Sequence, residues 1–100
     1  MEFRTISIKE LETYMEKQNA WLIDLRSKED YDLCHLQGAK NIPYDDLKRY
    51  SGSLPRDKIL IFYCERGGMS LMAAKDLSRA GYHAATVIGG LRAWEEQRLN

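Results

Sequence analysis

Short segments with strand-forming residues alternate with stretches of helical periodicity along the chain. The strand-like segments are 21–23, 39–43, 59–63 and 83–88. Between them, apolar residues recur at three- and four-residue intervals, which is typical of amphipathic helices. Strands that alternate with helices imply right-handed crossovers, so the pattern predicts an open α/β sheet of parallel strands flanked by helices on both faces.

Capping residues mark the ends of the predicted helices. Ser7 and Glu10 have the spacing of a capping box, and apolar residues follow at helical spacing. Ser27 is the expected N-cap of a brief helix that runs to Leu33. Further helices are expected over Tyr44–Tyr50, from about Ser70 to Ala80 before Gly81, and after Gly89-Gly90, where Leu91, Trp94 and Leu99 would pack.

The segment Ile59–Tyr63 is the most apolar part of the chain. It contains five successive large apolar or aromatic residues, two of them β-branched. A strand of this composition is typically covered on both faces, as the inner strands of parallel sheets are. We therefore expect it at the centre of the sheet.

Length and charge narrow the class of protein. The chain has 100 residues, with 15 Lys+Arg against 15 Asp+Glu, so we expect one domain over residues 1–100. A formal charge of zero argues against nucleic-acid and membrane-surface partners, because both usually require a basic excess. The first residues lack the apolar region of a secretory signal, and no apolar run is as long as a membrane span, which predicts a cytoplasmic protein.

The cysteine count excludes two further classes. Cys34 and Cys64 are 30 positions apart and form no CxxC pair, so a disulfide scaffold is not expected. Two cysteines and two histidines also lack the clustered spacing of a zinc site. We expect neither a metal site nor a cofactor.

The segment Cys64–Ser70 carries the candidate chemistry. Cys64 follows the predicted central strand, and a helix begins about six residues later. Ligands bind at this edge of open α/β sheets. Gly67 and Gly68 allow backbone N–H groups to turn inward as an anion-binding nest, and the helix start adds unpaired N–H groups. A thiol at the base of such a loop is expected to favour its thiolate form.

A structural interpretation of Cys64 stands beside this functional one. Free cysteines are among the most buried residue types, and a cysteine at the end of a strand is often only a small core residue. The two glycines, Arg66 and the helix start that follow Cys64 favour the functional interpretation. The sequence therefore predicts a sulfur nucleophile that meets an anionic substrate.

Four motifs resemble those of a known family. They are Trp21–Arg26, an apolar strand that ends in D-x-R; His35–Pro43, similar to H-I-x-G-A-x-N-I-P; Cys64–Met69, a six-residue active loop with glycine at its fourth position; and Gly89–Trp94, similar to G-G-x-x-x-W. In this order and spacing, they make nearly the whole chain resemble a single rhodanese-like sulfurtransferase domain. The resemblance implies a rhodanese-like open parallel sheet of about five strands.

The resemblance also implies a sulfurtransferase that works through a persulfide on the catalytic residue Cys64. Cys64 would take the outer sulfur of a small anionic donor, such as thiosulfate or a persulfide, and pass it to a thiol, cyanide or protein acceptor. Arg66 would steer the anionic donor. The substrate-binding residues would be those of the loop and the helix start: Glu65, Arg66, Gly67, Gly68, Met69 and Ser70.

The loop departs from the pattern of many family members, and other functions remain open. Met69 stands where many members have Arg, Thr or Ser, and the cationic residue is Arg66 at the third position. A non-catalytic interaction module, or a sulfur carrier between proteins, would use the same fold. A cysteine phosphatase or arsenate reductase needs an arginine six positions after the cysteine, where this chain has Ser70.

Residues outside the loop are expected to be structural. Asp24 and Arg26 share the sheet edge of Cys64 and would tie loops together by hydrogen bonds and an ion pair, behind the substrate. Cys34 and His35 are expected at the opposite edge, because the helix after Asp24 would return the chain there. Cys34 would then be too far from Cys64 to act as a resolving thiol. His83, at the start of a strand, is expected at that same far edge.

Overall fold

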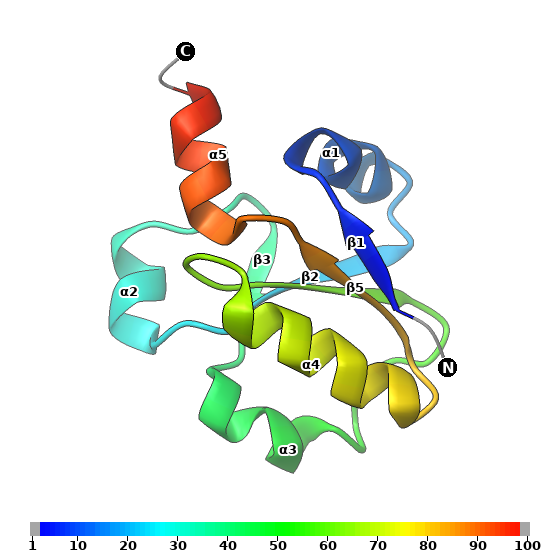
Figure 1. The fold of residues 1–100 in the computed structure, drawn as a ribbon. Helices are drawn as coiled ribbons and strands as arrows, with labels where there is room; N and C mark the ends of the chain where they lie inside the picture. Colours follow the sequence, from blue (N-terminus) through cyan, green and yellow to red (C-terminus); the bar gives the residue numbers. More distant parts are fainter. Residues whose placement is uncertain (1–2, 99–100) are drawn as a thin grey trace.

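The computed structural model describes residues 3–98. Five parallel strands form one open sheet in the order β1-β5-β4-β2-β3, and helices cover both faces (Figure 1). This architecture confirms the predicted fold class. In chain order, the elements are β1 (Arg4–Ile6), α1 (Ile8–Glu16), β2 (Ala20–Asp24), α2 (Lys28–Leu33), β3 (Ala39–Asn41), a 3-10 turn (Tyr44–Asp46), α3 (Leu47–Tyr50), β4 (Ile59–Tyr63), α4 (Gly68–Arg79), β5 (His83–Val87) and α5 (Gly90–Arg98).

β4 is the central strand, as predicted. It pairs with β2 on one side and with β5 on the other. Phe62 and Cys64 belong to the core cluster that α3 and α4 cover, whereas Ile61 and Tyr63 belong to the cluster beneath α1 and α5. Alternate positions along a strand face opposite sides of the sheet. The cysteine therefore faces α4, and the tyrosine before it faces away from α4.

The predicted caps are present, and the boundaries differ in a few places. Ser7 and Glu10 form the reciprocal capping box of α1, and the Ser27 hydroxyl caps α2. α4 begins at Gly68, two residues earlier than expected. The fifth strand, β1, was not predicted, because three residues at the sheet edge are too short to show a period. The predicted packing residue Leu99 lies outside the described residues.

The prediction for Cys34 and His35 was wrong. The N–H of Leu36 bonds to the hydroxyl of Tyr63, the last residue of β4, and the Cys34 carbonyl accepts from Arg26. The chain does not return to the far edge, because α2 has only six residues, which is about 9 Å of helix. β3 then starts beside Leu22, halfway along β2. The segment 34–36 therefore lies at the same sheet edge as Cys64.

A buried hydroxyl on α4 lacks a partner and supplies a stability prediction. Ser78 is 1% exposed, and its Oγ has no hydrogen-bond partner among residues 3–98. Leaving such a group unpaired costs free energy, and alanine also favours the helix. We expect Ser78→Ala to raise the free energy of unfolding by about 1 kcal/mol in urea denaturation. A loss of stability would show that the hydroxyl has an internal partner.

Candidate active site

Cys64 lies directly after β4, where the strand gives way to the loop that leads into α4. Its Sγ accepts a hydrogen bond from the N–H of Gly67 at 3.2 Å and lies 3.7 Å from Oγ of Ser70. Cys64 itself is 2% exposed, whereas most of the loop that follows it is exposed. The sulfur therefore lies at the base of an exposed loop, beneath the start of α4.

Of the inward-turned amides expected from Gly67 and Gly68, only that of Gly67 donates to Sγ among the described residues. This residue adopts a φ of +114°, a left-handed conformation that a side chain would strain, and its N–H meets Sγ. Within residues 3–98, no second backbone amide donates to the sulfur. The start of α4 adds N–H groups that lack helical partners and carries a partial positive charge. The sulfur therefore lies beside one backbone donor and the positive end of a helix dipole.

Two buried hydroxyl groups lie beside the sulfur. Ser70 donates to the carbonyl oxygen of Gly67 at 3.1 Å, and the hydroxyl of Thr86 donates to Ser70 Oγ at 2.7 Å. Ser70 is fully buried and Thr86 is 3% exposed. The bond to the Gly67 carbonyl ties the Ser70 side chain to the first turn of α4. Thr86 was missed, because a β-branched residue in β5 gives no signal beyond that of a strand.

The start of α5 holds the backbone of the loop. The N–H of Leu91 donates to the carbonyl oxygen of Cys64 at 2.9 Å, and the N–H of Arg92 donates to that of Glu65 at 3.0 Å. A Cβ atom at Gly90 would lie 2.3 Å from the Cys64 carbonyl oxygen. The glycine pair at 89–90 was interpreted only as a turn and a family motif, although paired glycines also signal such close backbone approach.

Asp24 and Arg26 form the predicted ion pair, buried behind the loop. Arg26 Nη2 lies 2.8 Å from Asp24 Oδ2, and the two side chains are 6% and 0% exposed. Tyr63 adds a third member, because its hydroxyl donates to Asp24 Oδ2 at 2.6 Å. Arg26 Nη1 lies 3.6 Å from Glu65 Oε1. Arg26 therefore reaches the loop, whereas Asp24 anchors Arg26 from behind.

Burial and Asp24 set the protonation of this cluster. Burial, together with the hydrogen bond to Asp24, raises the pKa of Tyr63 well above its ordinary value. Burial alone would lower the pKa of Arg26, but the hydrogen bond to Asp24 and the charge of Asp24 outweigh it and raise that pKa. Tyr63 therefore stays a neutral donor, and Arg26 stays charged, throughout the neutral range.

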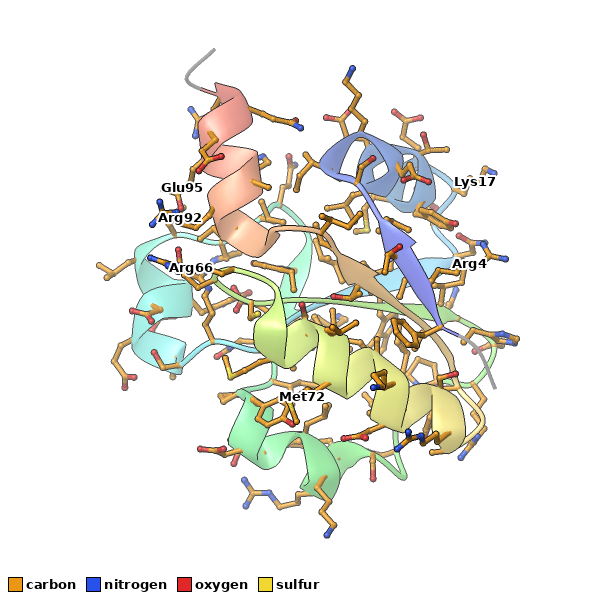
Figure 2. The ribbon with its side chains drawn as sticks, in the orientation of Figure 1. Arg4, Lys17, Arg66, Met72, Arg92 and Glu95 are labelled. Atoms are coloured by element: carbon orange, nitrogen blue, oxygen red, sulfur yellow. The ribbon has the colours of Figure 1, made fainter. Side chains whose placement is uncertain are left out.

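The outer edge of the loop carries positive charge. Figure 2 shows Arg66 on the loop and Arg92 on α5 at the same side of the molecule, and both are exposed. Neither forms an ion pair within the described part of the chain, whereas the charge of Glu65 lies close to Arg26. Met69, in the first turn of α4, is 39% exposed. Of the predicted substrate-binding residues, Glu65, Arg66, Gly68 and Met69 are thus exposed, whereas Ser70 is fully buried, and the prediction that it contacts substrate is not supported.

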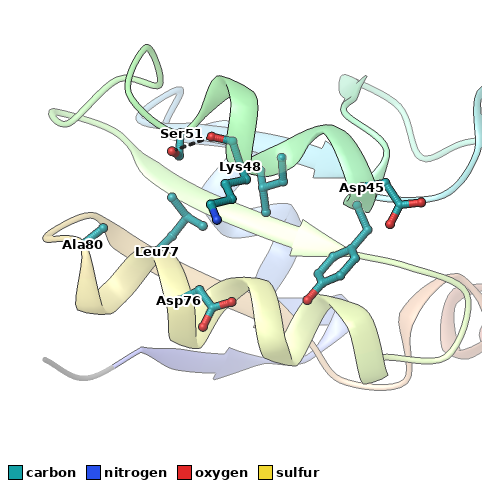
Figure 3. A pocket seen from close by; sticks show the side chains of 8 residues that line it. Asp45, Lys48, Ser51, Asp76, Leu77 and Ala80 are labelled. Atoms are coloured by element: carbon teal, nitrogen blue, oxygen red, sulfur yellow. Dashed lines mark hydrogen bonds between the residues drawn. The ribbon is translucent and has the colours of Figure 1, made fainter.

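A separate hollow of about 540 Å³ lies between α3 and α4 (Figure 3). Its walls come from the 3-10 turn, from α3 and the second half of α4, and from the residue that follows each of these two helices: Tyr44, Asp45, Leu47, Lys48, Ser51, Asp76, Leu77 and Ala80. Neither Cys64 nor any residue of its loop lines this hollow. The hollow is therefore not the candidate active site.

The described residues hold no metal-ligand cluster. Across positions 3–98, no group of three or more His, Cys, Asp or Glu side chains is placed to hold a metal ion. The two histidines have other contacts: His35 stacks on Tyr31, and His83 begins β5 at the far edge, as predicted.

Within residues 3–98, no helix combines the length and the apolar character needed to cross a membrane.

Comparisons with known proteins identify the family of the chain. The sequence profile of the Rhodanese-like domain matches residues 7–97. The adenylyltransferase and sulfurtransferase uba4 of Ogataea parapolymorpha is 37% identical over 79 residues, which are 77% of this chain and 20% of that protein. The thiosulfate sulfurtransferase GlpE of Shewanella oneidensis is 27% identical over 95 residues, which are 94% of each protein.

Solved structures show the same fold. The human single-domain sulfurtransferase TSTD1 superposes with a TM-score of 0.82 at 27% identity, covering 95% of this chain and 97% of that one. A rhodanese-related protein from Thermoplasma volcanium gives a TM-score of 0.85 at 27% identity, over 95% and 93% of the two chains. The chain spans a quarter or less of the length of several longer sequence relatives, uba4 among them. With its five-stranded parallel sheet and its cysteine loop after the central strand, the chain belongs to the rhodanese-like domain family and is homologous to sulfurtransferases.

Proposed function

We propose that the protein is a sulfurtransferase in which Cys64 carries the transferred sulfur as a persulfide. The observation that supports this most directly is the position of Sγ: it lies at the carboxyl end of β4, accepts the Gly67 N–H at 3.2 Å and sits beneath the start of α4. Donors placed around a sulfur in this way favour its anionic, nucleophilic form. The similarity to a thiosulfate sulfurtransferase supports thiosulfate as one donor.

The first half of the reaction loads the cysteine. The Cys64 thiolate attacks the outer sulfur of thiosulfate, and a new S–S bond forms between the two sulfur atoms. The bond between the outer and central sulfur atoms of the donor breaks, and its electron pair leaves with sulfite. The step is a displacement at sulfur by the thiolate, so it requires no external oxidant.

The second half of the reaction transfers the sulfur from Cys64 to the acceptor. A thiolate or cyanide acceptor attacks the outer sulfur of the persulfide, and Cys64 leaves as a thiolate. The product is an acceptor persulfide or thiocyanate, and the enzyme returns to its initial state. The Gly67 N–H, which meets Sγ, would stabilise the charged sulfur at the start and at the end of the cycle.

The charges around the loop suit an anionic donor. Arg66 is exposed and free of ion pairs within residues 3–98, so its guanidinium is available to the oxygens of the donor. Glu65 would repel such a donor, but Arg26 lies 3.6 Å from its carboxylate and offsets that charge. In this proposal Gly68 and Met69 border the donor, and Asp24 and Arg26 hold the loop from behind.

Phosphoryl transfer is disfavoured by the residue six positions after the cysteine. Ser70 occupies the place where a cysteine phosphatase needs a guanidinium to brace three oxygens. Its hydroxyl is fully buried and bonded to Gly67 and Thr86. We therefore expect no turnover of chromogenic phosphate esters.

Mass spectrometry of the intact protein tests the proposal. After incubation with thiosulfate, or with a low-molecular-weight persulfide, we expect a mass gain of one sulfur atom located on Cys64, and subsequent cyanide treatment should reverse it. Cys64→Ser should gain nothing, because an alkoxide is not formed at this site at neutral pH. Cys34→Ser is the matched control and should gain the sulfur normally, since Cys34 lies outside the loop and is exposed.

The opposite result would identify the other function that this fold supports. If the mass of the native protein stays unchanged with every donor, while the protein remains folded, Cys64 does not carry sulfur. The chain would then be better described as an interaction module that keeps the fold without the chemistry.

A further inference from the structure

Three side chains form a line that ends at the nucleophile. Thr86 Oγ1 lies 2.7 Å from Ser70 Oγ, which lies 3.7 Å from Cys64 Sγ. Thr86 comes from β5 and Ser70 from the first turn of α4. All three residues are at most 3% exposed. Water therefore does not compete strongly for these groups, and the protein itself decides which of them donates.

The protons of the Thr86 and Ser70 hydroxyls and of the Cys64 thiol can be placed in only a few hydrogen-bonding arrangements. The carbonyl oxygen of Gly67 can only accept, and it receives the hydroxyl proton of Ser70 at 3.1 Å. Ser70 then has lone pairs left for the proton of Thr86 and for that of a neutral Cys64 thiol. A hydroxyl group has one proton to give and two lone pairs. When the sulfur is protonated, the thiol and both hydroxyl groups therefore each donate their proton to an acceptor.

Loss of the thiol proton requires only one change. A thiolate can only accept, so the Ser70 proton can turn from Gly67 to Sγ. The Gly67 carbonyl is not left without a partner, because the N–H of Leu71 already donates to it at 3.0 Å. Thr86 keeps donating to Ser70 Oγ throughout, which leaves the Ser70 proton free to point at the sulfur. The anion would then receive two donors, the Gly67 N–H and the Ser70 hydroxyl.

We propose that Thr86 is a positioning residue for the nucleophile: by donating to Ser70, it makes Ser70 a hydrogen-bond donor to the Cys64 anion. This inference rests on the proposed function only in taking Cys64 as the reactive thiol. Within residues 3–98, no hydrogen bond joins Thr86 to the sulfur, and no proton is lost from Thr86 or Ser70 during transfer. A hydroxyl that itself accepts a hydrogen bond is a better donor, because neighbouring hydrogen bonds polarise one another.

The rate at which iodoacetamide alkylates Cys64 at one fixed neutral pH tests this directly. The measurement is made in the Cys34→Ser background, so that Cys64 is the remaining thiol. Thr86→Val keeps the shape of the side chain and removes the hydroxyl, whereas Thr86→Ser keeps the hydroxyl and removes the methyl group. We expect Thr86→Val to slow alkylation about two- to threefold, less than the loss of one whole hydrogen bond because Ser70 keeps its own proton, and Thr86→Ser to restore most of the rate.

A double-mutant cycle shows whether Thr86 acts through Ser70. In a Ser70→Ala background, Thr86 has no hydroxyl group to act on, so adding Thr86→Val should change the alkylation rate by less than about 1.3-fold. Thermal unfolding of each variant identifies those that are folded at the assay temperature. If Thr86→Val is not folded there, Thr86→Ala and Ser70→Ala take its place, and both should be slow.

The outcomes separate this inference from the proposed function. Equal rates for the native residue and Thr86→Val would overturn the inference. A Thr86→Ser protein as slow as Thr86→Val would also overturn it, since the hydroxyl at position 86 would then not be enough to support the rate. The inference would also be overturned if Thr86→Val slowed alkylation by the same factor with and without Ser70→Ala. Alkylation needs no sulfur donor, so a protein that forms no persulfide but shows the expected rates would refute the proposed function and leave this inference standing.

Discussion

Replacing Asp24 with alanine should remove a large share of the folding free energy. The carboxylate is fully buried, pairs with Arg26 and accepts the Tyr63 hydroxyl. Without it, the Arg26 guanidinium stays buried with only Glu65, at 3.6 Å, as a counter-charge. Breaking a buried pair from one side costs about 3–5 kcal/mol, within a total of about 5–15 kcal/mol for a domain. The midpoint and slope of urea unfolding measure the loss.

Two matched variants isolate the cause. Asp24→Asn keeps the shape of the side chain and one acceptor oxygen but loses the charge, so it should fall between the native protein and Asp24→Ala. Asp46→Ala removes an ion pair with Arg49 whose side chains are 40% and 71% exposed, and it should hardly change the midpoint, because exposed pairs contribute little. Equal effects of Asp24→Ala and Asp46→Ala would contradict the importance of the buried cluster.

The second large effect is expected from Gly90→Ala. Gly90 has a φ of +59°, and an added Cβ would lie 2.3 Å from the carbonyl oxygen of Cys64 and 2.8 Å from that of Glu65. These neighbours are backbone atoms, so the loop and α5 must move apart. The left-handed conformation and the overpacking together should cost about 2–4 kcal/mol. Separation would also break the bonds from Leu91 and Arg92 to the loop, so the alkylation rate of Cys64 should change.

Gly52→Ala is the control for this substitution. No heavy atom lies within 4 Å of an added Cβ at Gly52, and its φ is not in the left-handed region. Alanine there should leave the free energy of unfolding within about 1 kcal/mol of the native value. If Gly90→Ala proved as harmless as Gly52→Ala, the close approach of α5 to the loop would be wrong.

The sequence predicted the parts of the molecule that depend on local patterns. Ile59–Tyr63 is a continuous apolar run, and the run alone placed β4 at the centre of the sheet. Ser7 and Ser27 are caps because each bonds a backbone N–H three residues away. The positions of Cys64 and Gly67 could also be predicted from neighbouring sequence, since both lie in the loop that follows β4. These features need no knowledge of distant segments.

The parts that were missed depend on contacts between distant segments. Thr86 reaches Ser70 across 16 positions of the sequence, and Tyr63 reaches Asp24 across 39. Cys34 was placed at the wrong edge because the path of the chain there depends on where β3 pairs along β2. The need for glycine at position 90 becomes evident only when α5 is packed against the loop, where a Cβ would overlap the loop backbone. Periodicity and composition contain none of this information.

The two hydrogen bonds that backbone N–H groups of α5 donate to the loop have a consequence for biosynthesis. Leu91 and Arg92 follow the cysteine by more than 25 positions, yet they hold the carbonyls of Cys64 and Glu65. On the ribosome, where the amino-terminal portion emerges first, the nucleophile and its glycines appear well before these anchors do. A nascent polypeptide halted ahead of Gly89 would contain every reactive group of the loop and still lack the clamp that fixes it.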